Sequence, residues 1–339
     1  MRKKAVTGFR LLMHLIITLI ILVLSPGLSY SETASYPTGK HDEKIETWSF
    51  HSKLDLPEKD GALYVGMFFC AGSLYFLKGN FAHIFWLDTS TGAYSYENNI
   101  FIPPFEKVVH CDKKLNEKYH DNFFSFNAEK NAFMTYASLE DLSTRLTFFP
   151  QKAPLCFDYV NPDEMTEKTF DWYLFPQMNI KAVLKNKYDL QTSGKGFFQH
   201  FWGEKVYESG DFLVAHLDSG YNILVNDIML SKDGTPLMPE KYEYILISGP
   251  DGKVEKISSF EYRVHKWAES GNKGKKYPVH MSVSSSQKNL NLDIRVFKKD
   301  QTANLLGVEK WFGYAAVTGH IDDSPQKGWA FFSPIGIKN

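Results

Sequence analysis

Residues 289–297 read Asn-Leu-Asn-Leu-Asp-Ile-Arg-Val-Phe, an almost strict alternation of polar and apolar side chains. Successive side chains of a β-strand point to opposite faces, whereas a helix repeats its faces every 3.6 residues. The stretch therefore predicts a strand with one buried and one solvated face. Tyr242, Tyr244 and Leu246 alternate in the same way around Glu243.

Turn signals recur at short spacing around such stretches. They are Ser90-Thr91-Gly92, Ser209-Gly210-Asp211, Asp218-Ser219-Gly220, Asp233-Gly234 and Asp251-Gly252. Many short strands with close turns predict an all-β fold, either a barrel or a sandwich. Long helical periodicity is scarce, and short helices are expected only at 112–119, 137–146 and 162–168.

The composition is that of a globular protein, with 43% hydrophobic and 23% charged residues. Aromatic residues reach 15%, which favours half-buried β-structure and suits an apolar cavity. The formal net charge is -1, so no basic surface indicates nucleic acid as a partner. No phosphate-binding loop, Ser-His-Asp signature or zinc-protease motif is present, and no cofactor is implied.

The first 31 residues have the pattern of a secretory signal peptide. Arg2, Lys3, Lys4 and Arg10 precede the apolar run Leu11–Leu24, and small residues at 29 and 31 fit a cleavage site. The run is short for a membrane span, although an uncleaved anchor remains the alternative. We therefore expect an exported protein, periplasmic or extracellular, with no membrane span after signal removal.

The exported part is long enough for two domains. Residues 32–44 are polar and are expected to form a linker. Pro150, Pro154, Pro162 and Pro176 fall in one irregular stretch, which predicts a connection between two β-domains at 45–185 and 186–339.

Three cysteines follow the signal region. Cys70 lies in an apolar run and is expected to be a buried small hydrophobe. Cys111 and Cys156 lie near turns and form the better candidate pair in an oxidising compartment.

The richest segment is Gly-Phe-Phe-Gln-His-Phe-Trp-Gly-Glu at 196–204. On a strand, His200, Trp202 and Glu204 share one face. A hairpin through Ser209-Gly210 would lead to a second row containing His216 and Asp218. A two-residue turn leaves these two on the opposite face, and a loop one residue longer or shorter brings one of them opposite Trp202.

If these residues of the two strands meet inside one barrel, they would support acid-base chemistry. Buried carboxyl groups such as Glu204 or Asp218 can hold a proton near neutral pH, and an indole can stabilise a cation. His200 and His216 would orient or relay the proton. A metal held by the histidines is a weaker reading of the same residues. In the plainest alternative, Trp202 is core and the polar groups only satisfy one another.

Two further clusters combine tryptophan with polar or small residues. Glu46-Thr47-Trp48-Ser49-Phe50 opens the region after the linker, and Trp311-Phe312-Gly313 lies near the end. Tryptophan beside glycine in a strand indicates close packing at a barrel corner.

With these segments the chain resembles the lipocalin-like family of hydroxyneurosporene synthase (carotenoid hydratase) and the AttH-like proteins. Residues 46–50 match a Glu-Trp-Trp-Tyr-Phe signature without its first Trp and its Tyr. Residues 196–204 and Leu217-Asp218-Ser219-Gly220 match the middle signature, and residues 311–313 with Gly319 match the last. The aromatic strand at 328–333 lacks the expected acid.

The resemblance implies two lipocalin-like antiparallel β-barrel units packed together around an apolar pocket. It implies hydration, isomerisation or cyclisation of a polyene, isoprenoid or lipid-like substrate. The expected catalytic residues are Glu204, Asp218, His200 and His216, and the expected substrate-binding residues are Trp202, Trp48, Glu46 and Trp311. A carrier of a hydrophobic ligand and a structural protein of the cell envelope are the alternatives.

Overall fold

The computed structural model describes residues 45–57, 60–74, 77–101, 108–110, 115–119, 121–160, 168–203, 209–229, 231–232, 235–236, 243–270, 275–305 and 308–335. Within these ranges the chain forms β-strands and turns, with one 3-10 turn at Ser286–Lys288 and no α-helix. The predicted signal peptide, the linker and Glu204 lie outside them. The strands form two compact units, one ending at Gly203 and one starting at Ser209.

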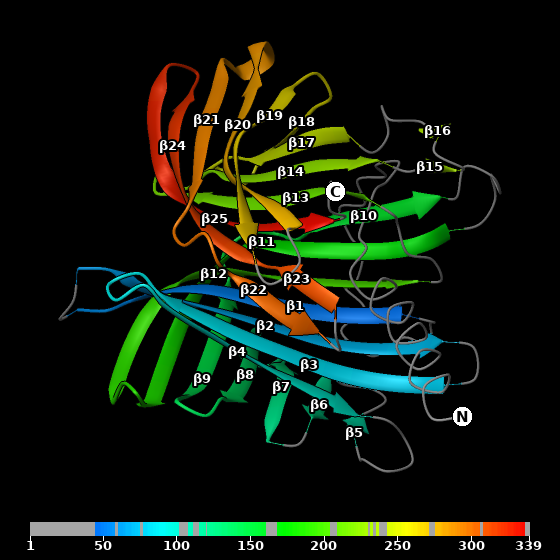
Figure 1. Cartoon of the computed structure of the whole chain (residues 1–339), viewed down its shortest axis with the longest axis vertical. Helices are drawn as coiled ribbons and strands as arrows, with labels where there is room; N and C mark the ends of the chain where they lie inside the picture. Colours follow the sequence, from blue (N-terminus) through cyan, green and yellow to red (C-terminus); the bar gives the residue numbers. More distant parts are fainter. Residues whose placement is uncertain are drawn as a thin grey trace. The chain divides into compact units, whose positions relative to one another are not determined.

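The first unit is a 12-stranded antiparallel sheet (Figure 1). Its order is β4-β3-β2-β1-β12-β11-β9-β8-β7-β6-β5, with β10 also paired to β11. The strands are β1 (Ile45–Asp55), β2 (Ala62–Leu74), β3 (Leu77–Asp88), β4 (Ala93–Phe101), β5 (Val108–His110), β6 (Asn116–Tyr119), β7 (Asn122–Asn127), β8 (Ala132–Ser138), β9 (Leu142–Pro150), β10 (Leu155–Val160), β11 (Lys168–Asn186) and β12 (Leu190–Gly203).

The second unit is a 9-stranded antiparallel sheet in the order β18-β17-β14-β13-β25-β24-β21-β20-β19. Its strands are β13 (Ser209–Leu217), β14 (Asn222–Met229), β17 (Glu243–Ser248), β18 (Val254–Ile257), β19 (Glu261–Ser270), β20 (Lys275–Ser285), β21 (Leu290–Val296), β24 (Gly313–Ile321) and β25 (Ser324–Ile335). Two short ribbons, β15 (Ser231–Lys232) with β16 (Thr235–Pro236) and β22 (Thr302–Leu305) with β23 (Val308–Trp311), stand outside this order.

The predicted all-β class with two lipocalin-like units is confirmed, since each sheet curves into a barrel or half-barrel. The alternating stretch at 289–297 forms β21, in which Leu290, Leu292 and Ile294 are buried. The units divide between Gly203 and Ser209, later in the chain than the predicted boundary after residue 185. Strand β12 pairs with β1 and β11 and therefore belongs to the first sheet.

The predicted helix at 137–146 is wrong, because this segment ends β8 and begins β9. In β9, Leu142, Thr144 and Leu146 are buried and alternate with more exposed residues, which is a strand period. The predicted helix at 112–119 is wrong at its described end, where Asn116–Tyr119 forms β6. The one predicted at 162–168 lies outside the described residues except for Lys168, which starts β11.

Aromatic rings fill the interior of the first unit. Phe198 of β12 stacks on Phe50 of β1 at a centroid distance of 4.4 Å and lies 4.4 Å from Phe133 of β8. All three side chains are at most 1% exposed. Dense aromatic packing of this kind contributes dispersion and burial energy, and it creates an apolar surrounding for any polar group placed within it.

Gly196 allows β12 to approach β1 closely. A Cβ at this position would lie 2.1 Å from the carbonyl oxygen of His51 and 2.7 Å from Cδ1 of Ile180. Any larger residue would push apart the two strands that carry the candidate site. Gly313 meets a similar demand in the second unit, where a Cβ would lie 1.8 Å from the Trp311 ring.

Candidate functional site

The register of three neighbouring strands brings polar and aromatic residues together in the first unit. Trp48 of β1 and Tyr173 of β11 lie opposite His200 of the central strand β12, one on each side. Glu46 lies opposite Trp202 one row further along. Alternation on each strand directs these five side chains to the interior face, the face that also carries Phe50 and Phe198.

His200 makes hydrogen bonds through both ring nitrogens. Its Nε2 lies 2.8 Å from Oε1 of Glu46, and its Nδ1 lies 3.2 Å from the hydroxyl of Tyr173. All three side chains are at most 2% exposed. A hydrogen bond between a carboxyl group and an imidazole requires one shared proton, so the Glu46–His200 pair retains a proton inside the unit.

Two indole rings enclose the His200 imidazole. Trp48 stacks nearly parallel to it at 5.2 Å and 17°, and Trp202 lies 4.6 Å away with a 39° tilt. Tyr173 meets the imidazole edge-on at 5.2 Å. Indole faces stabilise a neighbouring positive charge, so this surrounding favours an imidazolium or another cation beside it.

Such an arrangement suits proton transfer. If Nε2 donates to the Glu46 carboxylate, Nδ1 is left as the acceptor for the Tyr173 hydroxyl. The phenol oxygen could then take a proton from a bound molecule while its own proton passes to His200, and Glu46 would stabilise the resulting imidazolium. This is the general logic of an oriented acid-base relay.

A second buried carboxyl group faces the same interior. Glu117 and Tyr119 are the two buried residues of β6, and both are fully excluded from solvent. Burial, followed by the negative charges of Glu117, Cys70 and Glu46, raises the pKa of the Tyr119 phenol well above its ordinary value. Tyr119 belongs to the same core cluster as Trp48 and Trp202, so this side of β6 faces the same interior.

Comparison with known proteins identifies the family and the fold. The model of the AttH-like family matches residues 76–333, which is more than half of the chain. The chain belongs to the AttH-like family. The predicted resemblance is thereby confirmed. No curated protein sequence matches the chain.

Two solved structures share the fold of this AttH-like chain. A crystal structure of an AttH protein from Nitrosomonas europaea has a TM-score of 0.75 at 17% identity, covering 92% of this chain and all of that one. A crystal structure of kievitone hydratase from Nectria haematococca has a TM-score of 0.68 at 13% identity, covering 93% of each chain. At these identities the likeness establishes the fold.

Of the predicted site residues, the AttH-like fold unites Glu46, Trp48, His200 and Trp202. The predicted hairpin between the segments around 200 and 216 is wrong, because β12 and β13 belong to different sheets. His216 lies in the second unit, where Nδ1 is 2.9 Å from Nδ2 of Asn222 and the ring stacks on Trp329.

The other predicted residues of the second unit have separate environments. Asp218 is exposed and lies 4.0 Å from Nζ of Lys327, so it is not the buried acid that was expected. Trp311 is core, and its Nε1 donates to the Lys299 carbonyl oxygen at 3.1 Å. Glu204 lies outside the described residues.

Sequence reasoning missed Tyr173, Glu117 and Tyr119. Tyr173 falls within an aromatic run that was interpreted as a connection between domains. Leu115 and Tyr119 lie four residues apart with the charged Glu117 between them, so the residue types fit a helix as well as a strand, and only the burial pattern of β6 shows the period of 2.

Cys70 is buried, as predicted, and is a free thiol. Burial raises its pKa to about 12, against the opposing effect of the Thr47 hydrogen bond and with a further increase from the Glu46 charge. A thiol in this state is a poor nucleophile. Cys111, the predicted disulfide partner of Cys156, lies outside the described residues.

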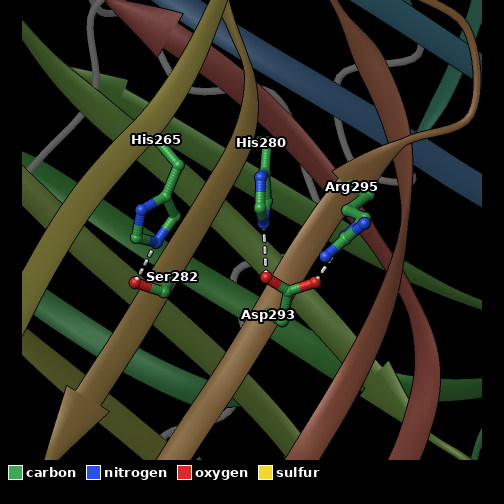
Figure 2. A network of polar contacts seen from close by, with 5 residues as sticks. All are labelled: His265, His280, Ser282, Asp293 and Arg295. Atoms are coloured by element: carbon green, nitrogen blue, oxygen red, sulfur yellow. Dashed lines mark hydrogen bonds and ion pairs between the residues drawn. The ribbon is translucent and has the colours of Figure 1, made fainter.

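A polar network covers part of the outer face of the second unit (Figure 2). His265 Nε2 lies 2.7 Å from the Ser282 hydroxyl, and His280 Nε2 lies 2.5 Å from Asp293 Oδ1. Arg295 Nε donates to the other Asp293 oxygen at 2.6 Å. Partial burial alone would raise the pKa of Asp293, but the bonds from His280 and Arg295 outweigh it and lower the pKa.

The network ties β19, β20 and β21 together on a partly exposed surface. It lacks the enclosure of the first site, and we assign it a structural role. Within the described ranges, no group of three or more His, Cys, Asp or Glu side chains is arranged to hold a metal ion, and no helix is long and apolar enough to cross a membrane.

Proposed function

We propose that this protein is a hydratase, which adds water across a carbon–carbon double bond of an apolar polyene, isoprenoid or lipid-like substrate. The observation that carries the proposal is the buried Glu46–His200–Tyr173 relay enclosed by Trp48 and Trp202. The chain belongs to the AttH-like family and shares its fold with a solved hydratase structure. This similarity supports the same reaction class.

In the proposed reaction, the relay starts with His200 as an imidazolium paired with Glu46. The Tyr173 hydroxyl gives its proton to one carbon of the alkene and takes up the Nδ1 proton of His200, which leaves a cation on the other carbon. The oxygen of a water molecule bonds to that cation and releases a proton. The Tyr173 hydroxyl receives this proton as its own passes to Nδ1 of His200, and Glu46 balances the charge of the imidazolium. The indole faces of Trp48 and Trp202 stabilise the intermediate cation.

The test is incorporation of heavy oxygen from labelled water into a panel of isoprenoid and polyene alkenes, followed by mass spectrometry. The wild-type chain from residue 32 onward should label at least one alkene. Glu46→Gln and Tyr173→Phe should lower the rate by roughly 10²–10⁴-fold, the usual contribution of a positioned acid-base group. His265→Gln, on the outer network, serves as the matched control and should retain the full rate.

A carrier that holds the same ligand without reacting it is the second candidate, favoured by the aromatic character of the residues that face the first interior. Solvent extraction of the purified protein separates the two. A retained polyene or lipid with no labelled product in any assay would support the carrier. Absence of both ligand and product would contradict both functions.

We also propose that the reaction takes place outside the cytoplasm, in the periplasm or beyond. The charged, apolar and small-residue pattern of residues 1–31 supports this. N-terminal sequencing of the chain recovered from the periplasm should start at residue 32, whereas an intact Met1 would indicate a retained anchor.

A further inference from the structure

The indole nitrogen of Trp48 is a buried hydrogen-bond donor in the middle of the candidate site. The Trp48 side chain is 0% exposed, and its Nε1 has no hydrogen-bond acceptor among the residues that the structure describes. Burying an N–H group without an acceptor is costly, because the group loses its hydration and gains no bond in return. The following inference rests on the proposed function and concerns the substrate atom that would accept this bond.

Two other buried tryptophans show the ordinary state of such a donor. Trp86, in the core of the same unit, donates from Nε1 to Oδ1 of Asp141 at 3.2 Å. Trp311, in the core of the second unit, donates to the Lys299 carbonyl oxygen at 3.1 Å. A buried tryptophan N–H commonly has a partner of this kind. The donor of Trp48 therefore requires an explanation that lies outside the packing of the chain on itself.

The position of the Trp48 ring places this donor beside the relay. The ring stacks on the His200 imidazole with centroids 5.2 Å apart and an angle of 17°, and the Phe124 ring lies 5.1 Å away. An indole N–H lies in the plane of its ring, so its bond direction is perpendicular to the stacking direction. An acceptor at the usual distance of about 2.9 Å would therefore lie at the edge of the indole, next to the stack and not between its rings.

We propose that the Trp48 N–H donates a hydrogen bond to an oxygen atom of the substrate. The substrate is then an oxygenated isoprenoid, an alkene that also carries a hydroxyl or carbonyl group, and not a pure hydrocarbon. The oxygen fixes the position of the chain, so that one double bond is held against the Tyr173 hydroxyl. A hydrocarbon analogue leaves the buried donor unpaired, which is how a polar group in a site discriminates against a ligand that lacks its partner.

Nuclear magnetic resonance of the indole N–H groups tests this contact independently of the reaction. The chain has 7 tryptophans, and Trp48→Phe identifies the Trp48 signal by its loss. The probes are geraniol, farnesol and geranylgeraniol, each paired with the hydrocarbon of the same skeleton that lacks the hydroxyl group. At least one alcohol should move the Trp48 N–H proton to higher frequency, and its hydrocarbon should not. No shift with any alcohol, the result expected of a trapped water molecule, or equal shifts with both members of each pair would overturn the proposal.

Kinetics separate failure of this inference from failure of the proposed function. The readout is the ratio of kcat/KM for an alcohol to that for its hydrocarbon. Trp48→Phe keeps an aromatic face but removes the N–H, and it should lower this ratio by roughly 10–100-fold. Trp86→Phe, the matched control, removes a donor that already has Asp141 as its acceptor and should leave the ratio unchanged. An unchanged ratio in Trp48→Phe would overturn the inference and leave the hydratase standing. If the wild-type chain hydrates nothing, the proposed function fails, while the indole signal still reports the Trp48 contact.

Discussion

At the scale of single residues, the first unit buries several acidic and histidine side chains. Glu46, His51, His83, Asp88, Glu117 and His200 are all at most 1% exposed. Buried polar groups of this kind lower stability unless hydrogen bonds compensate for lost hydration. Glu46 and His200 compensate each other, as do Asp88 and the Tyr188 hydroxyl at 2.7 Å. The hydrogen bond between Glu46 and His200 therefore offsets part of the cost of burying these two reactive groups.

His83 should make stability depend on pH. Burial lowers its pKa from 6.5 to about 4, against the opposing bonds from Asn98 and the Glu97 backbone. Between pH 6.5 and about 4, the His83 ring therefore binds a proton in the unfolded chain but stays neutral in the folded protein. The free energy of unfolding is therefore highest above pH 6.5. It falls by about 3 kcal/mol as the pH falls toward 4.

Urea unfolding at a series of pH values measures this effect. Wild type should lose stability across that window, and His83→Gln, which cannot titrate, should lose less. The exposed His265→Gln variant should follow wild type. Equal pH dependence in wild type and His83→Gln would show that His83 is not the group responsible.

At the scale of elements, the contact between β1 and β12 determines the site. Trp48 and His200 face each other only because the two strands pair in one register, and a shift by one residue would turn His200 to the other face. Gly196 permits this approach, since it pairs with Ser52 and a Cβ at this position would meet the carbonyl oxygen of the preceding residue, His51.

Gly196→Ala should therefore both destabilise the first unit and impair the site. The added methyl group meets a backbone carbonyl, which cannot move as a flexible side chain can, so we expect a loss of roughly 1–3 kcal/mol in the free energy of unfolding. Denaturant unfolding gives the number. Ser193→Ala, at an exposed position of the same strand, should change stability by less than about 0.5 kcal/mol. Equal stability of the two variants would refute the close-approach argument.

At the scale of the whole molecule, each unit has its own hydrophobic core. One cluster contains Leu146 and the aromatic interior around Phe198, and the other contains Leu292 and Ile294. A separate core is the usual condition for a domain that folds as a unit.

Core substitutions should then act within their own unit. Leu292→Ala should cost about 2–5 kcal/mol and increase hydrogen exchange in peptides from residues 209–335. Leu146→Ala, equally buried in the other core, should do the same for residues 45–203. Hydrogen exchange followed by mass spectrometry checks both variants. Increased exchange throughout the described chain after either substitution would instead indicate one cooperative structure.

The amino-acid sequence by itself determined the strand class and several members of the site. The alternation at 289–297 and the turn signals predict β-structure because side-chain direction along a strand is a local property. Glu46, Trp48, His200 and Trp202 were recognisable because acids, imidazole and indoles alternate in short aromatic segments.

Only the tertiary structure decided which strands are neighbours. The segments around 200 and 216 follow each other in sequence and predict a hairpin, yet β12 pairs with β1, whose residues lie about 150 positions earlier in the chain. Local patterns are the same in either arrangement, since both bury the same face. The choice between them depends on long-range pairing and on the aromatic core that forms between distant strands. For that reason Tyr173 joins the site, while His216, Asp218 and Trp311 belong to the other unit.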